Sequence, residues 1–422
     1  MGDQSESGRY SIFTRRRMLS GAAAIAFSTA IGSTLKTSTA SPSIPVSCLT
    51  GYNDAWKYWV ENGLGHSVVA SHVAASSSDV LRQNFQWQWH HPCENANDFE
   101  ELQRLVDLVA NLAVQTDTKI LPCITTVPVW ARSASGGILP QFLDYFGQYV
   151  AEIARRLSRW RDEHGILHNV LAGIEIGNEP NFFQLPSAGN TVPPANNHPC
   201  NVAPLPNQYF NPWCMSYEDH ADLVTYAYSW IEEYKNYNYV SPDTRIIAGG
   251  LFATWTEDYT IYGKRFRNGL NGSDHQSQRL NWCEYLYLFE SAVCAEYDVG
   301  IHPYYLGPYS GNPQSLANKI ANSILAIVDQ ALYISSKDIW ITETGATSKF
   351  PVEQQRQSTA LQMISNGMNS RPRCKSLLVH SLFSGEGPDS PYHQFGVIGV
   401  AGNPLLPFPK PAFSALATNW SN

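Results

Sequence analysis

The chain has 422 residues, of which 43% are hydrophobic, 12% aromatic and 15% charged, and its formal net charge is −8. This composition is typical of a soluble globular protein with one large α/β domain or two ordinary ones, and the chain is long enough to bury a substantial core. The acidic balance leaves no basic surface for a phosphate backbone, which argues against a nucleic-acid-binding protein.

The first 40 residues differ from the rest of the chain. Three arginines at 15–17 precede an apolar run, Leu19–Ile31, and then small residues at 38–40, the pattern of an export signal with a cleavage site. The arginine cluster resembles the bacterial twin-arginine signal. Because the apolar run is too short to span a bilayer, cleavage is favoured over a membrane anchor. We therefore predict a cleaved signal over residues 1–40, a single domain over residues 41–422, and a secreted or periplasmic protein without membrane association.

Seven short apolar runs predict strands that are buried on both faces, because they lack polar alternation and are rich in β-branched residues. They are Val80–Trp87, Lys119–Thr126, Val170–Gly177, Thr244–Leu251, Tyr297–Tyr304, Asp338–Thr344 and Ser376–Phe383. An eighth strand is expected between Ile44 and Ala75, at either Ile44–Leu49 or Ser67–Val73.

Five amphipathic segments lie between these runs and predict helices, because their apolar residues recur at intervals of three and four. They span residues 98–114, 142–160, 217–235, 315–332 and 352–368. Eight strand-helix units in one continuous chain favour a (β/α)8 barrel (TIM barrel) over a doubly wound sheet. The Pro- and Asn-rich segment Gln184–Ser216 and the polar segment Thr256–Asn281 predict long loops after strands 4 and 5 of the barrel.

Eight cysteines permit disulfides in an exported chain. None forms a C-x-x-C pair, which argues against a structural zinc site. The disulfides most expected between neighbouring cysteines are Cys200–Cys214 and Cys283–Cys294, although the connectivity cannot be determined from sequence.

Two glutamates close predicted barrel strands. Glu179 stands in an Asn-Glu-Pro tripeptide, where Pro180 ends the strand because it lacks an N–H. Glu343 is the last residue but one of the run "DIWITET". The carboxyl ends of barrel strands share one face, so both carboxylates can point into one cleft. Retaining glycoside hydrolysis needs an acid and a nucleophile about 5–5.5 Å apart. The alternative for each glutamate is a capping role at the end of its strand.

With these features the chain resembles the retaining glycoside hydrolases of clan A, most like members of family 39 or family 5. The resemblance includes Asn-Glu-Pro at the end of the fourth strand and a glutamate at the end of the seventh. The segments "VLRQNFQWQWHHP", "ILPCITTVPVWA" and "FGVIGVAGNPLLPFPKPAFSALA" resemble the second strand, the third strand and the closing stretch of that clan.

The resemblance implies a role for each matching residue. Glu179 would be the acid/base and Glu343 the nucleophile. Asn178 would hold the sugar 2-hydroxyl, and Arg82 would keep Glu343 ionised. His302 and Tyr304 would line the same subsite. The alternatives are a buried core histidine for His302 and a purely structural ion pair for Arg82.

The chain departs from the clan pattern at the end of the eighth strand. Many clan members carry a tryptophan there as a sugar platform, and the segment "LLVHSLFSGEG" offers Phe383 in its place. Trp130 is a second aromatic residue that we expect to stack on a sugar. Glu386 is the main rival carboxylate, whereas Glu175 lies deeper in the barrel and is expected to be structural.

The sequence therefore predicts an exported, retaining β-glycoside hydrolase that acts on an oligo- or polysaccharide without a cofactor. His90 and His91 precede a proline and have no third ligand at a suitable spacing, so no metal is expected either. Two alternatives remain: a catalytically silent carbohydrate-binding barrel, and a transglycosylase that uses the same two glutamates.

Overall fold

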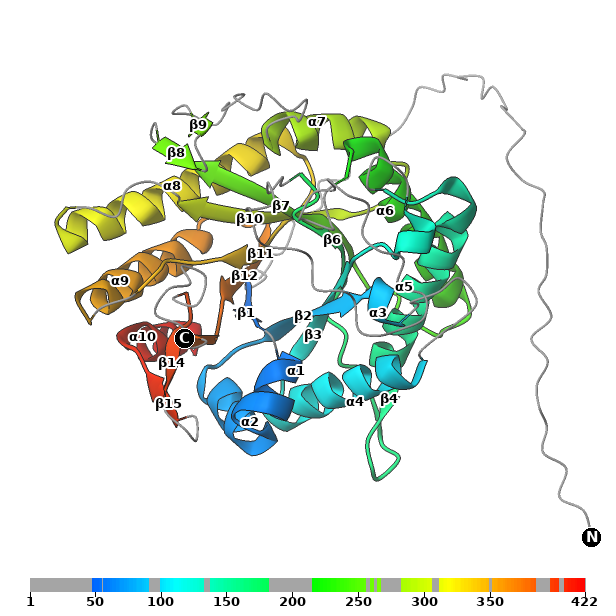
Figure 1. Ribbon diagram of the computed structural model, residues 1–422, viewed down its shortest axis with the longest axis horizontal. Coiled ribbons are helices and arrows are strands. Elements are labelled where there is room, and N and C mark those ends of the chain that lie inside the picture. Colours follow the sequence, from blue (N-terminus) through cyan, green and yellow to red (C-terminus); the bar gives the residue numbers. More distant parts are fainter. Residues whose placement is uncertain are drawn as a thin grey trace, which may run out of the picture. The chain divides into compact units, whose positions relative to one another are not determined.

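A computed structural model describes residues 48–54, 56–90, 99–132, 137–181, 215–255, 259–261, 264–266, 282–305, 311–348, 351–384, 395–401 and 406–421. Eight parallel strands close into a barrel (Figure 1), in which each strand pairs with the next and the last pairs with the first. These are β1 (Leu49–Asn53), β2 (Val80–Gln86), β3 (Lys119–Thr125), β6 (Ile174–Asn178), β7 (Ile246–Trp255), β10 (Asp298–Tyr305), β11 (Ile339–Thr344) and β12 (Cys374–His380). The predicted (β/α)8 barrel is confirmed.

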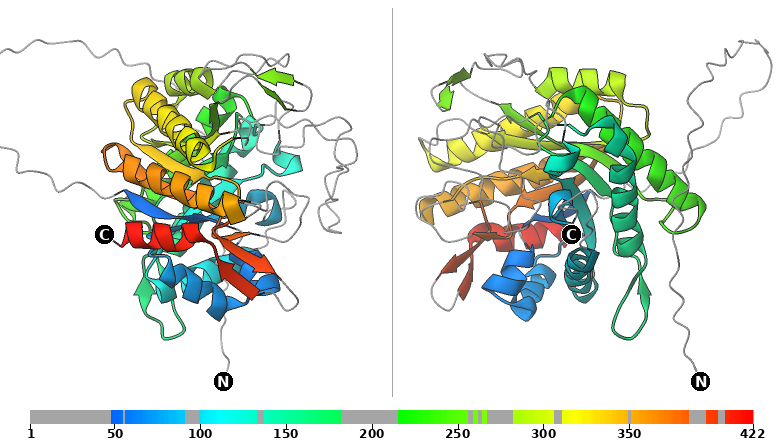
Figure 2. Two further views of the ribbon diagram at one scale, coloured as in Figure 1. Left: turned by 90° about the vertical axis from the view of Figure 1, so that its left-hand side faces the viewer. Right: turned by 45° about the vertical axis from the view of Figure 1, so that its right-hand side comes forward.

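Helices surround the barrel. The longer ones are α2 (His66–Ala75), α4 (Phe99–Thr116), α5 (Leu143–Ser158), α6 (Tyr217–Asn236), α7 (Trp282–Ala292), α8 (Pro313–Ile334), α9 (Pro351–Met368) and α10 (Pro411–Trp420). All five predicted helical segments are present, as α4, α5, α6, α8 and α9. Helices α8, α9 and α10 pack side by side outside the barrel (Figure 2). No helix in the described ranges is both long and apolar enough to cross a membrane.

Short elements complete the described part of the chain. Helical turns are α1 (Trp56–Tyr58), a π-turn at Trp59–Gly63, α3 (Trp87–His90) and 3-10 turns at Val129–Ala131 and Pro140–Phe142. Small sheets join β4 (Trp160–Arg161) with β5 (Leu167–His168), β8 (Tyr259–Ile261) with β9 (Lys264–Phe266), and β13 (Phe383–Ser384) with β14 (Ile398–Ala401) and β15 (Leu406–Pro409). The β8–β9 hairpin belongs to the predicted loop after strand 5. Most of that loop, most of the loop after strand 4, and the predicted signal lie outside the described residues.

The first strand lies within the expected interval Ile44–Ala75, but neither candidate position matches it. The strand is β1, which shares only Leu49 with the first candidate, while the second candidate, Ser67–Val73, lies inside α2. Val69 and Val73 are both buried and stand four residues apart, the spacing at which two side chains share a helix face. Packing of this face therefore overrode the strand preference of the β-branched residues.

One predicted disulfide is also absent. Cys294 carries a free thiol, so the expected bridge from Cys283 is not formed. Cys283 stands in the first turn of α7 and Cys294 lies beyond its last residue. At 1.5 Å per helical residue the two lie about 16 Å apart along the helix, too far for a disulfide. The other expected pair, Cys200 and Cys214, lies outside the described residues.

The barrel interior changes from apolar to polar toward the carboxyl ends of its strands. The layer nearer the amino ends of the strands is an apolar cluster, separate from the main core, formed by Val80, Leu121, Ile247, Trp340 and Leu378. One pleat further along, the inward positions carry Arg82, Glu175, His302 and Thr342, all of which are fully buried. This polar layer supports the side chains at the mouth of the barrel.

Candidate active site

Glu179 directly follows β6, at a turn that is held on two sides. Gly177 and Glu179 have positive φ angles of 89° and 49°, and for glutamate this left-handed conformation is rare. The Glu179 N–H donates to the Gly250 carbonyl at 2.9 Å, which ties the turn to β7. On the other side, His220 of α6 contacts the Ile176 carbonyl through Nε2 at 2.9 Å. The Glu179 side chain is partly exposed at the barrel mouth.

Arg82 and Glu175 form a fully buried ion pair below the mouth. Arg82 Nε donates to Glu175 Oε2 at 2.5 Å, and a second guanidinium nitrogen donates to Asn178 Oδ1 at 2.7 Å. Burial raises the pKa of Glu175, but the charge of Arg82 and the contact with His302 outweigh it and hold that pKa well below its ordinary value. Arg82 thus fixes Asn178 as well as Glu175.

Glu343 is held by hydrogen-bond donors from three other strands. Tyr304 on β10 donates its hydroxyl to Oε1 at 2.6 Å, and Asn53 on β1 donates its amide to Oε2 at 2.6 Å. Arg82 on β2 lies 3.4 Å from Oε2. Burial raises the pKa of Glu343, but the charges of His302 and Arg82, with the hydrogen bond from the Tyr304 hydroxyl, lower it below its ordinary value. Glu343 is therefore kept as a carboxylate, as a nucleophile requires.

His302 lies between the two glutamates and is fully buried. The Thr342 hydroxyl donates to Glu175 at 2.7 Å and so accepts from His302 Nε2, 3.1 Å away. The other ring nitrogen, Nδ1, lies 3.1 Å from Glu179 Oε1. Burial lowers the pKa of His302, but Glu343, Glu175 and Glu179 outweigh it and raise that pKa to about 9. The ring is thus a cation that donates from both nitrogens.

Close approach of β7 and β10 makes room for this histidine. A Cβ added at Gly250 on β7 would lie 2.0 Å from His302 Nε2. Only glycine fits at that position while the ring stays in place.

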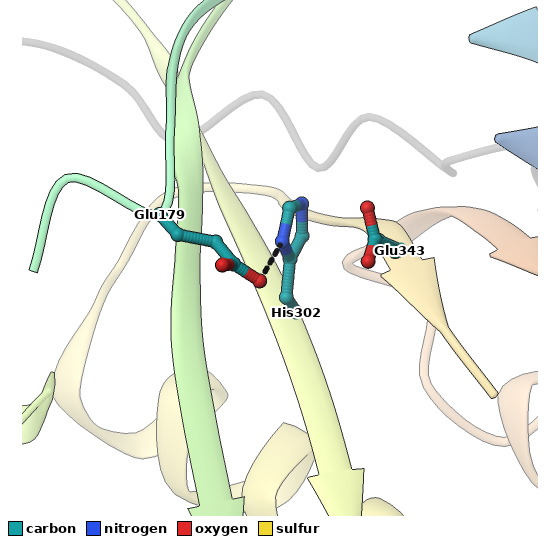
Figure 3. Close-up of side chains that lie close together, drawn as sticks. All are labelled: Glu179, His302 and Glu343. Carbon is teal, nitrogen blue, oxygen red and sulfur yellow. Dashed lines mark hydrogen bonds and ion pairs between the residues drawn. The ribbon is translucent and has the colours of Figure 1, made fainter. Parts of the chain in front are cut away.

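Figure 3 shows the side chains of Glu179, His302 and Glu343 close together, Glu179 from the turn after β6, His302 from β10 and Glu343 from β11. One carboxylate oxygen of each glutamate and one nitrogen of His302 all lie within 4.8 Å of one another. Such a trio has the donor types of a cation site, but Tyr304 and Asn53 direct hydrogen atoms at the Glu343 oxygens and Arg82 stands beside them. Because a cation and N–H or O–H donors already contact these carboxylate oxygens, the trio is poorly suited to hold a metal ion.

The structure brings most of the predicted site residues together: Glu179, Glu343, Asn178, Arg82, His302 and Tyr304. Trp130 is partly buried and makes edge contacts with Trp87 and Phe142, with ring centroids 5.6 and 5.0 Å apart. Its expected contact with a sugar stays a prediction. Glu386 lies outside the described residues.

Phe383 does not occupy the exposed platform position that we expected. Its side chain is 1% exposed, and its ring packs against Trp59 and His72 at centroid distances of 5.3 and 5.8 Å. The ring is buried because β12 ends at His380 and the chain then turns away into β13. His380 therefore takes the strand-end position, where it shares the Asn53 amide with Glu343.

Three residues at the mouth were missed by sequence reasoning. Asn53 was missed because the first strand was misplaced, and His380 because Phe383 was chosen from the same segment. Phe395 packs against Tyr304 and His380, with ring centroids 5.6 and 5.8 Å apart. The only signal for His380 was its place at the end of an apolar run.

Comparison with known proteins finds similar structures, but no related sequence. No family model matches the chain, and no curated protein matches it. A family 39 glycoside hydrolase from the gut symbiont Bacteroides cellulosilyticus WH2 is 13% identical with a TM-score of 0.53, over 88% of this chain and 63% of that chain. The apo structure of a β-glucosidase is 14% identical with a TM-score of 0.55, over 84% and 88%. A β-glucosidase from Exiguobacterium marinum is 13% identical with a TM-score of 0.52, over 89% and 97%.

This chain shares their fold. The expected structural resemblance to glycoside hydrolases of the barrel type is thereby confirmed. The chain spans less than two thirds of the length of the family 39 enzyme.

Proposed function

We propose that the protein is a retaining glycoside hydrolase that cleaves β-glycosidic bonds in an oligo- or polysaccharide. The observation that carries the proposal is the approach of a Glu179 oxygen and a Glu343 oxygen to within 4.8 Å. Retaining enzymes hold their two carboxyl groups about 5–5.5 Å apart, whereas inverting enzymes need about 6.5–9.5 Å to admit a water molecule. The β-glucosidase activity named for the structural neighbours is consistent with this reaction class.

In the first step Glu343 acts as the nucleophile. Its oxygen forms a bond to the anomeric carbon as the bond from that carbon to the leaving oxygen breaks. Glu179 transfers its proton to the leaving oxygen, so that the departing group leaves as an alcohol. Before this transfer, while Glu179 still holds its proton, the negative charges of Glu175 and Glu343 are balanced by the positive charges of Arg82 and His302. The group of these five side chains then has no net charge.

In the second step water replaces the enzyme at the anomeric carbon. Glu179, now a carboxylate, removes a proton from the attacking water, and the bond from the anomeric carbon to Glu343 breaks. The donors from Tyr304 and Asn53 again hold Glu343 as it regains its charge. Both glutamates thus return to their starting protonation states without a cofactor.

Asn178 is suited to the sugar 2-hydroxyl. Because Arg82 donates to its Oδ1 at 2.7 Å, the amide is oriented and its N–H₂ group remains as a donor next to Glu179. A hydrogen bond to the 2-hydroxyl strengthens as charge develops in the transition state. Cleavage of the predicted signal and export of the enzyme would bring this site to a polysaccharide outside the cytoplasm.

A panel of 4-nitrophenyl β-glycosides and soluble polysaccharides, tested with the wild type, Glu343→Gln and Glu179→Gln, checks the proposal. We expect each variant to lose at least about 10³-fold in kcat on unactivated substrates, since each removes one half of the double displacement. A 2-fluoro glycoside of the preferred sugar should add one sugar mass to the peptide that contains Glu343. Equal activity of all three proteins, or labelling elsewhere, contradicts the proposal. Longer products at high substrate concentration would indicate transglycosylation by the same residues.

A further inference from the structure

Asn53 links the proposed nucleophile to a histidine on the neighbouring strand. Asn53 and His380 are direct partners in the β1–β12 register, so both side chains lie on the same face of the sheet at the barrel mouth. The Asn53 amide nitrogen lies 2.6 Å from Glu343 Oε2 and 3.3 Å from His380 Nδ1. One amide group therefore contacts both residues.

The two contacts of the Asn53 amide determine which nitrogen of the His380 ring carries the proton. An amide nitrogen carries two hydrogen atoms and no lone pair that accepts, so it donates one hydrogen to the Glu343 carboxylate and the other to His380 Nδ1. Nδ1 is then an acceptor, and the proton of the neutral ring stands on Nε2. The reverse orientation of the amide would place its oxygen 2.6 Å from a carboxylate oxygen, which is repulsive.

The Nε2 edge of His380 is left for a ligand. His380 is partly exposed, and within the described ranges its Nε2 has no hydrogen-bond partner. The Phe395 ring lies between two rings of the site: its centroid is 5.8 Å from that of His380 and 5.6 Å from that of Tyr304. These aromatic groups therefore line the same side of Glu343. A sugar held against Glu343 would meet a neutral N–H donor here, because the contact with Asn53 leaves the ring proton on Nε2. Among the described residues, no lysine or arginine forms a hydrogen bond with His380.

From this geometry we infer that Asn53 and His380 act as one sugar-recognition unit, in which Asn53 positions Glu343 and directs the His380 Nε2–H at a hydroxyl group of the bound sugar. The inference rests on the proposed function and deepens it. It assigns His380 to a hydroxyl other than the 2-hydroxyl, because Asn178 lies across the site beside Glu179. The ligand chemistry is a neutral sugar hydroxyl, and a uronic acid carboxylate is the competing outcome.

The test compares the 4-nitrophenyl β-glycoside that the wild type hydrolyses fastest with its 3-deoxy, 4-deoxy and 6-deoxy analogues and its uronic acid counterpart. His380→Phe removes both ring nitrogens and keeps an aromatic ring against Phe395. We expect it to lower kcat/KM about 10- to 100-fold on the parent glycoside and less than about 3-fold on one deoxy analogue, because that analogue has already lost the hydrogen bond. His380→Gln, which keeps a donor, should recover part of the loss. His164→Phe, an exposed histidine between β4 and β5, serves as the matched control.

Asn53→Ala separates positioning from recognition. We expect it to lower kcat/KM on every glycoside of the set, and to move the acid limb of the pH profile to higher pH, because Glu343 loses a donor that stabilises its charged form. It should also lose the selectivity between the parent and the deoxy analogues. A variant that only disturbed packing would leave the acid limb where it is.

The outcomes distinguish the two proposals. Absence of wild-type activity on every glycoside overturns the proposed function and this inference with it. An active wild type with an equal effect of His380→Phe on all analogues, or with no effect, overturns the inference alone. A loss confined to the uronic acid substrate also overturns it, because it would assign His380 to a carboxylate.

Discussion

Arg82 shows how one buried side chain connects the chemistry to the stability of the barrel. It contacts Glu175, Asn178 and Glu343 at once and is fully buried. The buried ion pair with Glu175 is present, and the same guanidinium group, which has several donors, also contacts Glu343, the proposed nucleophile.

Arg82→Met tests this dual role. Removal of the cation leaves Glu175 buried and uncompensated, so we expect a loss of about 3–5 kcal/mol in the free energy of unfolding. We also expect kcat/KM to fall by at least about 100-fold, since Asn178 and Glu343 lose a partner. Arg104→Met is the control, because Arg104 is 58% exposed and pairs with Glu101 at the surface. A surface pair contributes at most about 1 kcal/mol. Equal destabilisation by the two variants would contradict the prediction.

His302 predicts a dependence of stability on pH. Its pKa is about 9 in the folded protein, against 6.5 for an unperturbed histidine. The folded state therefore binds the proton more tightly than the unfolded state. The resulting stability is fully present below pH 6.5 and is lost as the pH rises through about 9.

Urea unfolding of the wild type and His302→Gln at intervals from pH 6 to pH 9.5 measures this effect. The wild type should lose up to about 3 kcal/mol more than the variant over that range. Parallel curves would show that the histidine does not gain a proton on folding.

At the scale of elements, the turn after β6 depends on its contact with α6. His220 of α6 is fully buried, and its pKa falls to about 4 because burial outweighs the contact with the Ile176 carbonyl and the charge of Glu175. The ring is therefore neutral at physiological pH and donates Nε2–H to Ile176, three residues before Glu179. A Cβ at Gly177 would lie 3.6 Å from the same nitrogen, so helix and strand are already in contact there.

His220→Phe should remove an acid-dependent loss of stability. A folded pKa below the unfolded value means that the unfolded state binds the proton first. The stability is therefore present above pH 6.5 and is lost as the pH falls toward 4. Thermal unfolding of the wild type from pH 7 to pH 4 should show a steeper decrease in Tm than that of the variant, with His164→Phe as the control. A variant that is as acid-sensitive as the wild type would refute the assignment.

The strand β11 shows why its glutamate could not be oriented from sequence alone. Trp340 belongs to the barrel interior and Thr342 bonds to Glu175, so strict alternation would turn Glu343 outward. The pairing of β11 with β12 shifts its register between Ile341 and Thr344. This irregularity lets Glu343 face the mouth, as bulges near active sites commonly do.

For the whole molecule, closure of the barrel brings the two ends of the described chain together. β1 lies between β2 and β12, and the bond from Asn53 to Glu343 joins residues 290 positions apart. Gly51 on β1 pairs with Val80 on β2, and a Cβ added at Gly51 would lie 1.7 Å from the Val80 carbonyl oxygen. Since that oxygen belongs to the backbone, it cannot rotate away.

Gly51→Ala should therefore weaken closure and the site together. We expect a loss of more than about 2 kcal/mol in the free energy of unfolding, and a fall in kcat that exceeds the loss of folded protein, because Asn53 lies two residues further along β1. Gly63→Ala is the matched control, since the nearest atom to its added Cβ is in the Trp59 side chain at 3.0 Å. Equal unfolding midpoints for both variants in urea would rule out the predicted strain.

The sequence by itself determined the order of strands and helices and, from it, the barrel. Buried runs and helical periodicity are local patterns, and seven of the eight strands and five long helices were found from them. It also placed Glu179 and Glu343 at the ends of the fourth and seventh strands. The tertiary structure alone decided which side chains meet there: Asn53, His380 and Phe395 joined the site, while Phe383 entered the core. These contacts depend on barrel closure, strand register and competition for buried space, which act between residues far apart in the chain.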